Sequence, residues 1–235
     1  MKVICSISAR IGSKEIPKKN IRLLNGKPLI TYAINSALNS NLISKVIVNT
    51  DSEEIAIIGR EQGAEVPFIR NSSLADDKTP LLMVTKNTME EMIQIGYEPD
   101  IIIQLSPTCP FIKTETIDES IILAKEYMCA LTVKKIEHEH PYRAKILDTK
   151  KNIRPFIKDI DVEKFQSRQD LPLLYCTSGA IYTRTKELLS TASEDDFCLG
   201  PNPRGIILND VESINIDREI DFRFSEFLMN EKNQF

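Results

Sequence analysis

The feature that most constrains this chain is a regular alternation of short apolar runs with amphipathic segments through its first half. The apolar runs predict four strands, at Val3–Ser8, Lys45–Asn49, Ile101–Leu105 and Ala130–Val133. The segments between them predict helices at Leu29–Leu38, after Ser52, at Leu81–Ile95 and from Thr114 to about Tyr127. Strand, helix, strand in this order implies right-handed crossovers. We therefore predict an α/β fold with a mainly parallel central sheet that is covered on both faces.

This alternation breaks between about 137 and 172, a stretch that holds both histidines and many charged residues. We predict a single domain over 1–235 with an inserted segment here, which is a β-rich lobe, a lid or an arm that packs on another subunit. Regular structure resumes with strands at Leu173–Thr183, Gly205–Leu208 and Ser213–Ile216. The predicted helices of this half are Arg184–Thr191 and a final amphipathic helix from about Glu219 to Asn230.

Composition argues against several classes of partner. The formal net charge of −4 disfavours a generic nucleic-acid surface, which is normally basic. The five cysteines are widely spaced and form no CxxC pair, so they predict reduced thiols and no zinc site. The N-terminal apolar run Val3–Ile7 is too short for a signal peptide or a membrane span. We expect a cytoplasmic protein that binds neither nucleic acid nor a membrane.

The loop after the first strand carries the clearest chemical signal. It reads Ser8-Ala9-Arg10-Ile11-Gly12-Ser13-Lys14 and is followed by Pro17-Lys18-Lys19-Asn20. Four cations within ten residues, beside a glycine that lets the backbone approach a ligand, indicate a polyanion site. The alternative is a solvated basic loop. Neither the Walker pattern nor the GxGxxG dinucleotide pattern is present in the sequence.

These residues resemble the opening of the acylneuraminate cytidylyltransferases, the CMP-sialic acid synthetase family. The resemblance continues in the family's order and covers nearly the whole chain. Its further blocks are Asn25-Gly26-Lys27-Pro28-Leu29, Asn49 to Ala56, Arg70 with Leu74 to Asp77, Pro107 to Pro110, Arg168 to Pro172, Ser178 to Tyr182, and Glu212 to Asp217.

The resemblance implies a Rossmann-like nucleotidyltransferase domain with a small dimerisation lobe, a homodimer, and CTP with Mg²⁺ as co-reactants. The implied nucleotide-binding residues are Ala9, Arg10, Gly12, Ser13, Lys14, Lys19, Asn20 and Arg70. The implied contacts to an acidic nine-carbon sugar are Ser106, Arg143, Arg168 and Tyr182. Asp217 and Asn215 are the implied metal ligands, and Arg10, Lys19 and Asp217 are the implied catalytic residues.

Two blocks depart from the family pattern. The usual SIDID motif reads Ser213-Ile214-Asn215-Ile216-Asp217, so a neutral amide replaces one carboxylate. Positions two apart on a strand share a face, so both side chains can address one ion, but Asn215 predicts weaker metal binding, a single-carboxylate site or lost catalysis. The alternative for Asp217 is a helix N-cap. In the usual LQPTSPLR motif, Ser106 replaces Gln and Ile112 replaces Arg, which indicates a different acceptor such as a legionaminic- or pseudaminic-type sugar.

The chemistry of nucleotidyl transfer agrees with the resemblance. An anionic acceptor must approach a tetra-anionic triphosphate, so cations and a metal must offset the repulsion. The anomeric hydroxyl would attack the α-phosphorus, with pyrophosphate leaving toward Lys14 and Lys19. We therefore expect a CTP-dependent cytidylyltransferase that makes a CMP-sugar for cell-surface polysaccharide. The alternatives are another nucleotide or acidic sugar, such as an octulosonate, and a degenerate nucleotide-binding protein.

Other candidates have simpler interpretations. His138 and His140 are either a metal or base pair or, as we expect, exposed lobe residues. Asp76 and Asp77 are either a second metal site or, as we expect, a loop or cap before the Leu81 helix. The apolar residues of the last helix predict core or dimer packing; these are Phe222, Phe224, Phe227 and Leu228.

Overall fold

The computed structural model describes residues 1–12, 15–76, 78–158, 160–161, 164–165 and 167–232. Its centre is a six-stranded sheet in the order β10-β6-β9-β5-β1-β4. The strands are β1 (Val3–Ser8), β4 (Lys45–Asn49), β5 (Ile101–Leu105), β6 (Cys129–Lys135), β9 (Tyr175–Thr185) and β10 (Arg204–Ile207). β9 runs antiparallel to both β5 and β6, and the other neighbours are parallel. The predicted α/β fold with a mainly parallel sheet is confirmed.

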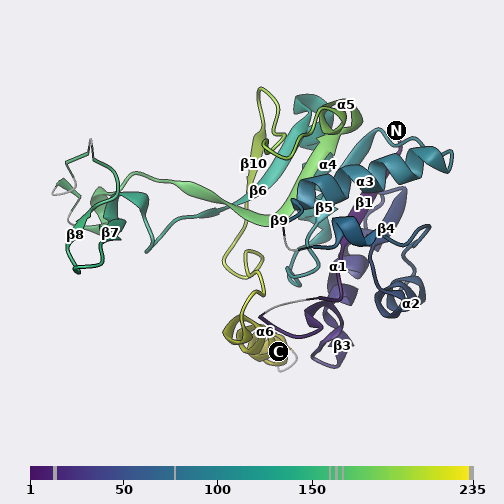
Figure 1. The fold of residues 1–235 in the computed structure, drawn as a ribbon, viewed down its shortest axis with the longest axis horizontal. Coiled ribbons are helices and arrows are strands. Elements are labelled where there is room, and N and C mark those ends of the chain that lie inside the picture. The colour runs from purple at the N-terminus through teal and green to yellow at the C-terminus, as the bar shows by residue number, and fades with distance from the viewer. Residues whose placement is uncertain (13–14, 77, 159, 162–163, 166, 233–235) are drawn as a thin grey trace.

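Helices cover both faces of this sheet, as its buried strands require. They are α1 (Leu29–Leu38), α2 (Glu53–Glu61), α3 (Leu81–Gln94), α4 (Thr114–Tyr127) and α5 (Lys186–Ser190). The last helix, α6 (Glu219–Lys232), packs instead in a separate cluster, where Phe222 lies with Leu24 and Leu29. Successive residues of β1 point to opposite faces: Cys5 packs in the cluster that contains α1, while Ile4 packs in the cluster that contains Met92 of α3 and Leu189 of α5. The core is therefore three layers, helix, sheet and helix (Figure 1).

Smaller elements complete the chain outside the central sheet. Near the first loop lie η1 (Lys19–Ile21), β2 (Leu23–Leu24) and β3 (Lys27–Pro28), and η2 (Ser72–Leu74) precedes α3. The segment between β6 and β9 leaves the core as a long arm (Figure 1). The arm carries η3 (Pro141–Arg143), the antiparallel pair β7 (Lys145–Leu147) and β8 (Ile153–Pro155), and η5 (Arg168–Asp170).

His140 connects the two segments of chain that form the base of this arm, one on each side of β7 and β8. Its Nδ1 accepts from the backbone N–H of Tyr142 at 3.2 Å, so its Nε2 carries the proton and donates to the Pro172 carbonyl at 3.1 Å. The side chain is buried. Our expectation that both histidines are exposed is therefore wrong for His140, because its two nitrogens satisfy backbone groups; His138 is exposed.

Two sequence predictions of regular structure need correction. Ser213–Ile216 is not a strand: Ser213 N–H donates to the Asn209 carbonyl in a turn, and Ile216 N–H donates to the Thr108 carbonyl. β9 also extends through Thr185, because Arg184 pairs with strands on both sides, so α5 begins only at Lys186. Among the described residues, no helix is long and apolar enough to cross a membrane.

Candidate active site

The candidate site lies where β1, β4 and β5 end, at the edge of the sheet where parallel α/β proteins bind ligands. Backbone hydrogen bonds hold the loops there: Ala9 N–H donates to the Asn49 carbonyl at 3.0 Å, and Arg70 N–H donates to the Thr50 carbonyl at 2.8 Å. A pocket of about 460 Å³ opens between these loops. Its lining is Ser8, Arg10, Glu15, Ile16, Lys19, Asn20, Arg70, Leu74, Asp76, Thr79, Leu81, Val84, Ser106, Pro107, Thr108 and Asp217.

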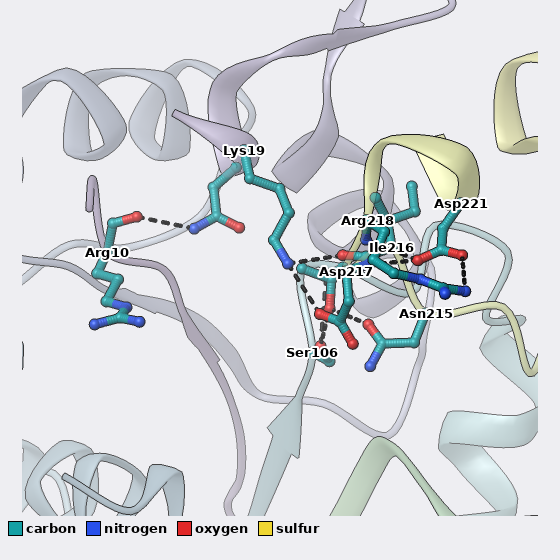
Figure 2. A network of polar contacts seen from close by, with 10 residues as sticks. Arg10, Lys19, Ser106, Asn215, Ile216, Asp217, Arg218 and Asp221 are labelled. Atoms are coloured by element: carbon teal, nitrogen blue, oxygen red, sulfur yellow. Dashed lines mark hydrogen bonds and ion pairs between the residues drawn. The ribbon is translucent and has the colours of Figure 1, made fainter. Parts of the chain in front are cut away.

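The first loop contributes Arg10 and, through η1, Lys19 and Asn20. Asn20 Nδ2 donates to the Arg10 carbonyl at 3.0 Å, which ties η1 to the first loop (Figure 2). Ala9 is buried behind it. A Cβ built at Gly12 would meet nothing within 4 Å, so the protein itself does not require glycine there. Ser13 and Lys14 lie outside the described residues. Lys18 is not in the pocket lining and pairs with exposed Glu54 at 2.8 Å.

Several buried polar atoms around this pocket have no hydrogen-bond partner among the described residues. They are Ser8 Oγ, Asn20 Oδ1, and Arg70 Nε and Nη2. Arg70 is 5% exposed, and burial lowers the pKa of its guanidinium, although Asp51 at 3.8 Å opposes this effect. A buried polar group without a partner costs about 1–3 kcal/mol. The residues that carry these atoms line the pocket, so a polar ligand bound there is a candidate partner for them.

Lys19 and Asp217 meet on the opposite wall. Lys19 Nζ donates to Asp217 Oδ1 at 3.0 Å and to the Ile216 carbonyl at 2.7 Å (Figure 2). The backbone N–H groups of Asp217 and Arg218 donate to the Asp221 carboxylate, so Asp221 serves the start of α6 while the Asp217 carboxylate stays on Lys19. The helix-cap alternative for Asp217 is not what these contacts favour.

Asn215 joins the wall through a relay of hydroxyl groups. Thr108 Oγ1 donates to Asn215 Oδ1 at 2.6 Å, and Thr108 Oγ1 lies 2.7 Å from Ser106 Oγ (Figure 2). Asn215 does not line the pocket in the part of the chain that the structure describes. Asn215 and Asp217 lie in the loop between β10 and α6, so the strand face that we expected them to share is absent, and Thr108 in the loop after β5 holds Asn215 instead.

Asp76 is engaged in its own loop. Its carboxylate accepts from Thr79 Oγ1 at 2.7 Å and from the backbone N–H groups of Thr79 and Lys78, and these bonds hold its pKa below the ordinary value. The loop interpretation is confirmed for Asp76, and Asp77 lies outside the described residues. Over the described ranges, no group of three or more His, Cys, Asp or Glu side chains is arranged to hold a metal ion.

A second pocket of about 460 Å³ adjoins the first and shares Leu81 with it. Its lining is Pro80, Leu81, Leu82, Gln104, Gly179, Tyr182, Arg184, Glu194, Asp195, Asp196 and Phe197. Gln104 pairs with Tyr182 across β5 and β9. Of the residues predicted to contact a sugar, Ser106 therefore lines the first pocket and Tyr182 the second.

Comparison with known proteins decides the family. A family model described as cytidylyltransferase matches residues 4–195. The chain belongs to the cytidylyltransferase family.

The relatives of this cytidylyltransferase include enzymes named for nonulosonic acids. It is 32% identical to the CMP-N,N'-diacetyllegionaminic acid synthase of Legionella pneumophila, covering 100% of this chain and 98% of that protein. It is 32% identical to the pseudaminic acid cytidylyltransferase of Campylobacter jejuni, covering 97% and 96%. The N-acylneuraminate cytidylyltransferase of Escherichia coli is 30% identical over 99% of this chain and 53% of its own length. The resemblance to the acylneuraminate cytidylyltransferases is confirmed.

A solved structure supports the fold of this cytidylyltransferase independently. A CMP:2-keto-3-deoxy-manno-octonic acid synthetase complexed with CTP superposes with a TM-score of 0.72 at 19% identity, covering 99% of this chain and all of that one. At this identity the likeness establishes the fold.

The remaining predicted residues of this cytidylyltransferase lie on the arm, away from both pockets. Arg143 ends η3 and Arg168 begins η5, and Arg143 lines neither pocket. The sequence reasoning missed Gln104 and Arg184, which line the second pocket. Gln104 did leave a signal, because it is the single polar residue in the run Ile101–Leu105.

Proposed function

We propose that this protein is a CTP-dependent cytidylyltransferase that joins CMP to a nonulosonic acid and releases pyrophosphate. The observation that carries the proposal is the first pocket, where three cations and several unpaired buried polar atoms surround a cavity at the ligand-binding edge of the sheet. The names of relatives that this chain matches over nearly its full length support the substrate class: they act on diacetyllegionaminic, pseudaminic and N-acylneuraminic acids.

On the nucleotide side, cations and loop amides share the work. Arg10 and Lys19 would bind the triphosphate, with Ser13 and Lys14 of the same loop still expected there. Asn20 and Arg70 would contact the cytidine, since Asn20 Oδ1 and two Arg70 nitrogens have no hydrogen-bond partner within the described chain. Ala9 and Gly12 would contribute backbone groups and space for close approach.

In the proposed reaction, the anomeric hydroxyl of the acceptor attacks the α-phosphorus. A sugar oxygen–phosphorus bond forms, the bond from the α-phosphorus to the bridging oxygen breaks, and the hydroxyl proton is lost to solvent. Pyrophosphate leaves with its added charge stabilised by Arg10 and Lys19. Because positioning and charge stabilisation dominate phosphoryl chemistry, no side-chain nucleophile is required.

The residues near Asp217 fit a magnesium ion that phosphates also bind. Mg²⁺ commonly takes one or two carboxylates together with substrate phosphates and water, and Asp217 offers an exposed carboxylate at the pocket wall. Asn215 would hold Thr108 or add a neutral oxygen. When bound, the ion would neutralise phosphate charge and so favour attack by the acceptor. Lys19, now 3.0 Å from Asp217, would turn to the phosphates.

On the acceptor side, we propose that the sugar bridges the two pockets, between Ser106 and Tyr182. Arg143 and Arg168 belong to an arm that projects from the core, so they would reach the sugar of a second copy. The arm also exposes more than half of the side chains of Leu147, Ile153 and Phe156, which favours a covering partner. We therefore propose a homodimer in which each arm completes the other subunit's site.

The free thiols suggest the cellular compartment of the protein, and the class of its product suggests the pathway. Five free cysteines suit a reducing cytoplasm, where CTP is available. A CMP-linked nonulosonic acid is an activated donor, so a transferase that builds cell-surface polysaccharide would consume it.

Pyrophosphate release from the purified protein tests this function. CTP, ATP, GTP and UTP are each supplied with a diacetamido nonulosonic acid, N-acetylneuraminic acid or an octulosonate, with Mg²⁺ present. We expect turnover with CTP and a nonulosonic acid. Turnover only with the octulosonate would move the acceptor class, and CTP binding without any turnover would indicate a degenerate nucleotide-binding protein.

A further inference from the structure

Gln104 is a polar side chain at the floor of the second pocket, and neither N–H of its amide group is used among the described residues. It lies in β5 on the face toward α3, and it is 6% exposed. Its Oε1 lies 3.5 Å from Arg184 Nη1 and 3.2 Å from Thr85 Oγ1. Because a guanidinium can only donate, this contact assigns the oxygen to the Arg184 side. Gln104 Nε2 then remains, and it donates to no group within the described residues.

Arg184, the partner of the Gln104 oxygen, is itself fixed by two hydrogen bonds to backbone carbonyls. Its Nε donates to the Cys198 carbonyl at 2.8 Å, and its Nη2 donates to the Phe197 carbonyl at 3.0 Å. Its guanidinium lies over the ring of Tyr182 at 4.9 Å. The side chain is 3% exposed and pairs with no carboxylate among the residues described. Arg184 therefore fixes both Gln104 and the loop that carries Phe197 into the pocket wall.

The charges around the second pocket disfavour an anionic group there. Among the described residues that line it, Arg184 is the single cation, while the rim carries three exposed acids: Glu194, Asp195 and Asp196. The first pocket sets three cations, Arg10, Lys19 and Arg70, against three acids, Glu15, Asp76 and Asp217, so it is less negative than the second. An acidic sugar that spans both pockets would thus direct its carboxylate toward the first and a neutral substituent toward the second.

The walls of the second pocket define that substituent further. Pro80, Leu81, Leu82 and Phe197 supply apolar surface, and the floor supplies the Gln104 N–H donor. A group with an acceptor oxygen and a short alkyl part fits both features, and an N-acyl group has them. A bare hydroxyl would leave the apolar walls without contact.

We propose that Gln104 is a specificity-determining residue, whose Nε2 donates to the carbonyl oxygen of an N-acyl group on the acceptor. The alkyl part of that group packs against Leu81 and Phe197. Arg184 is the positioning residue that keeps the amide oxygen turned away from the sugar. This inference rests on the proposed function and deepens it, because it names the substituent by which the enzyme distinguishes acidic sugars.

The test compares two acids that differ in one group. Pyrophosphate release is measured with N-acetylneuraminic acid and with the same acid bearing a hydroxyl in place of its acetamido group. Gln104→Glu keeps an oxygen for Arg184 but replaces the N–H donor with a second, charged oxygen, and Gln104→Met keeps the volume without either polar atom or any charge. Gln94→Ala, on the exposed end of α3, is the matched control.

The ratio of kcat/KM for the acetamido acid to that for the hydroxyl acid is the readout. In the wild type and Gln94→Ala, we expect a ratio of about 10 or more, the effect of one hydrogen bond to a buried donor. In both Gln104 variants the ratio should fall toward one, while the KM for CTP and the Tm stay near the wild-type values. A general loss of stability would lower turnover with both acids equally and leave the ratio unchanged.

The outcomes separate the inference from the function beneath it. If the wild type turns over both acids and the ratio survives in both Gln104 variants, or if the wild type shows no preference, Gln104 does not select the acyl group. If no acid supports pyrophosphate release, the proposed function itself fails and the inference falls with it.

Discussion

Lys19 neutralises one of the acids of the first pocket, because its ammonium donates to the Asp217 carboxylate. The same ammonium also donates to the Ile216 carbonyl. It is also the point at which the N-terminal loop meets the last loop of the chain, 198 residues away in sequence. A triphosphate entering the pocket would compete with Asp217 for this ammonium. The same residue thus serves the resting protein and the proposed transition state.

The first prediction concerns the two cations of the nucleotide side. Lys19→Ala and Arg10→Ala should each lower kcat/KM by about 10²-fold or more, since removing a charge that stabilises the transition state costs roughly 3 kcal/mol. Lys18→Ala is the matched control, because Lys18 pairs with exposed Glu54 outside the pocket. Pyrophosphate release measures the effect. Activity near wild type in both pocket variants would show that the loop is only a solvated basic turn.

The second prediction concerns Asn215 and Asp217. Asn215→Asp should lower the Mg²⁺ concentration needed for half-maximal turnover, because a second carboxylate beside Asp217 raises affinity for a hard cation. Asp217→Ala should abolish turnover in either background. A Mg²⁺ titration of the three variants decides this. A higher Mg²⁺ requirement in Asn215→Asp would mean that its amide serves chiefly to hold Thr108.

At the scale of elements, the sequence predicted the parts whose burial follows a period. β1, β4 and β5 were predicted at their observed bounds because both faces of each strand are buried. Ser213–Ile216 was predicted wrongly because Ile214 and Ile216 alternate as in a strand, although Ile216 is buried as part of a loop that bonds to Thr108. Alternation reports burial, and it does not require a neighbouring strand.

The candidate site was predictable where it is local in sequence and not where it depends on packing. The first loop could be read directly, since its cations follow one strand. Gln104 and Arg184 come from β5 and β9, and only the antiparallel pairing of these strands brings them to one floor. No spacing in the sequence encodes that pairing.

The third prediction concerns the loss of thermal stability at low pH that two carboxylates at the start of α6 should cause. Burial tends to raise the pKa of Asp221, but hydrogen bonds from the backbone of Arg218 and Asp217 outweigh it, and the net pKa is lowered; a hydrogen bond from Arg22 lowers that of Glu219. A lowered folded-state pKa gives stability above the unfolded value of about 4, which is lost as the pH falls through the folded value. The Tm should therefore fall below about pH 4.

Thermal unfolding between pH 7 and pH 3 measures this dependence. Asp221→Asn with Glu219→Gln should flatten the fall, whereas Glu231→Gln should not, since Glu231 forms no hydrogen bond or ion pair within the described chain. An unchanged slope in the double variant would assign the acid sensitivity to other carboxylates.

In the whole molecule, the arm is the feature whose exposed apolar side chains are not explained by the fold of a single chain. It extends from the core (Figure 1). Among the described residues, Leu147, Ile153 and Phe156 of the arm are exposed. We predicted an inserted segment at about 137–172 because the strand–helix alternation stops there, but its conformation depends on contacts that no local pattern records. The dimer that we propose gives these side chains a partner.

The fourth prediction tests that dimer by complementation. Lys19→Ala is inactive in its own pocket and Arg143→Ala fails to complete its neighbour's, so a mixed dimer retains one intact site. Random exchange of subunits should recover about a quarter of wild-type turnover, as expected for a twofold assembly. A mixture of Lys19→Ala with Arg10→Ala is the control and should recover none, because both residues line the same pocket. Equal results from the two mixtures would contradict the shared site.

β9 joins the arm to the centre of the sheet in a single strand. Its C-terminal half is hydrogen-bonded between β5 and β6, while its N-terminal end at Tyr175 pairs on one side with Lys135 at the base of the arm. Amide hydrogens of Ile181 to Arg184 should therefore exchange with deuterium among the slowest in the chain, and protection should decline steadily toward Tyr175. One strand would thus record, residue by residue, how far the rigidity of the core reaches toward a neighbouring subunit.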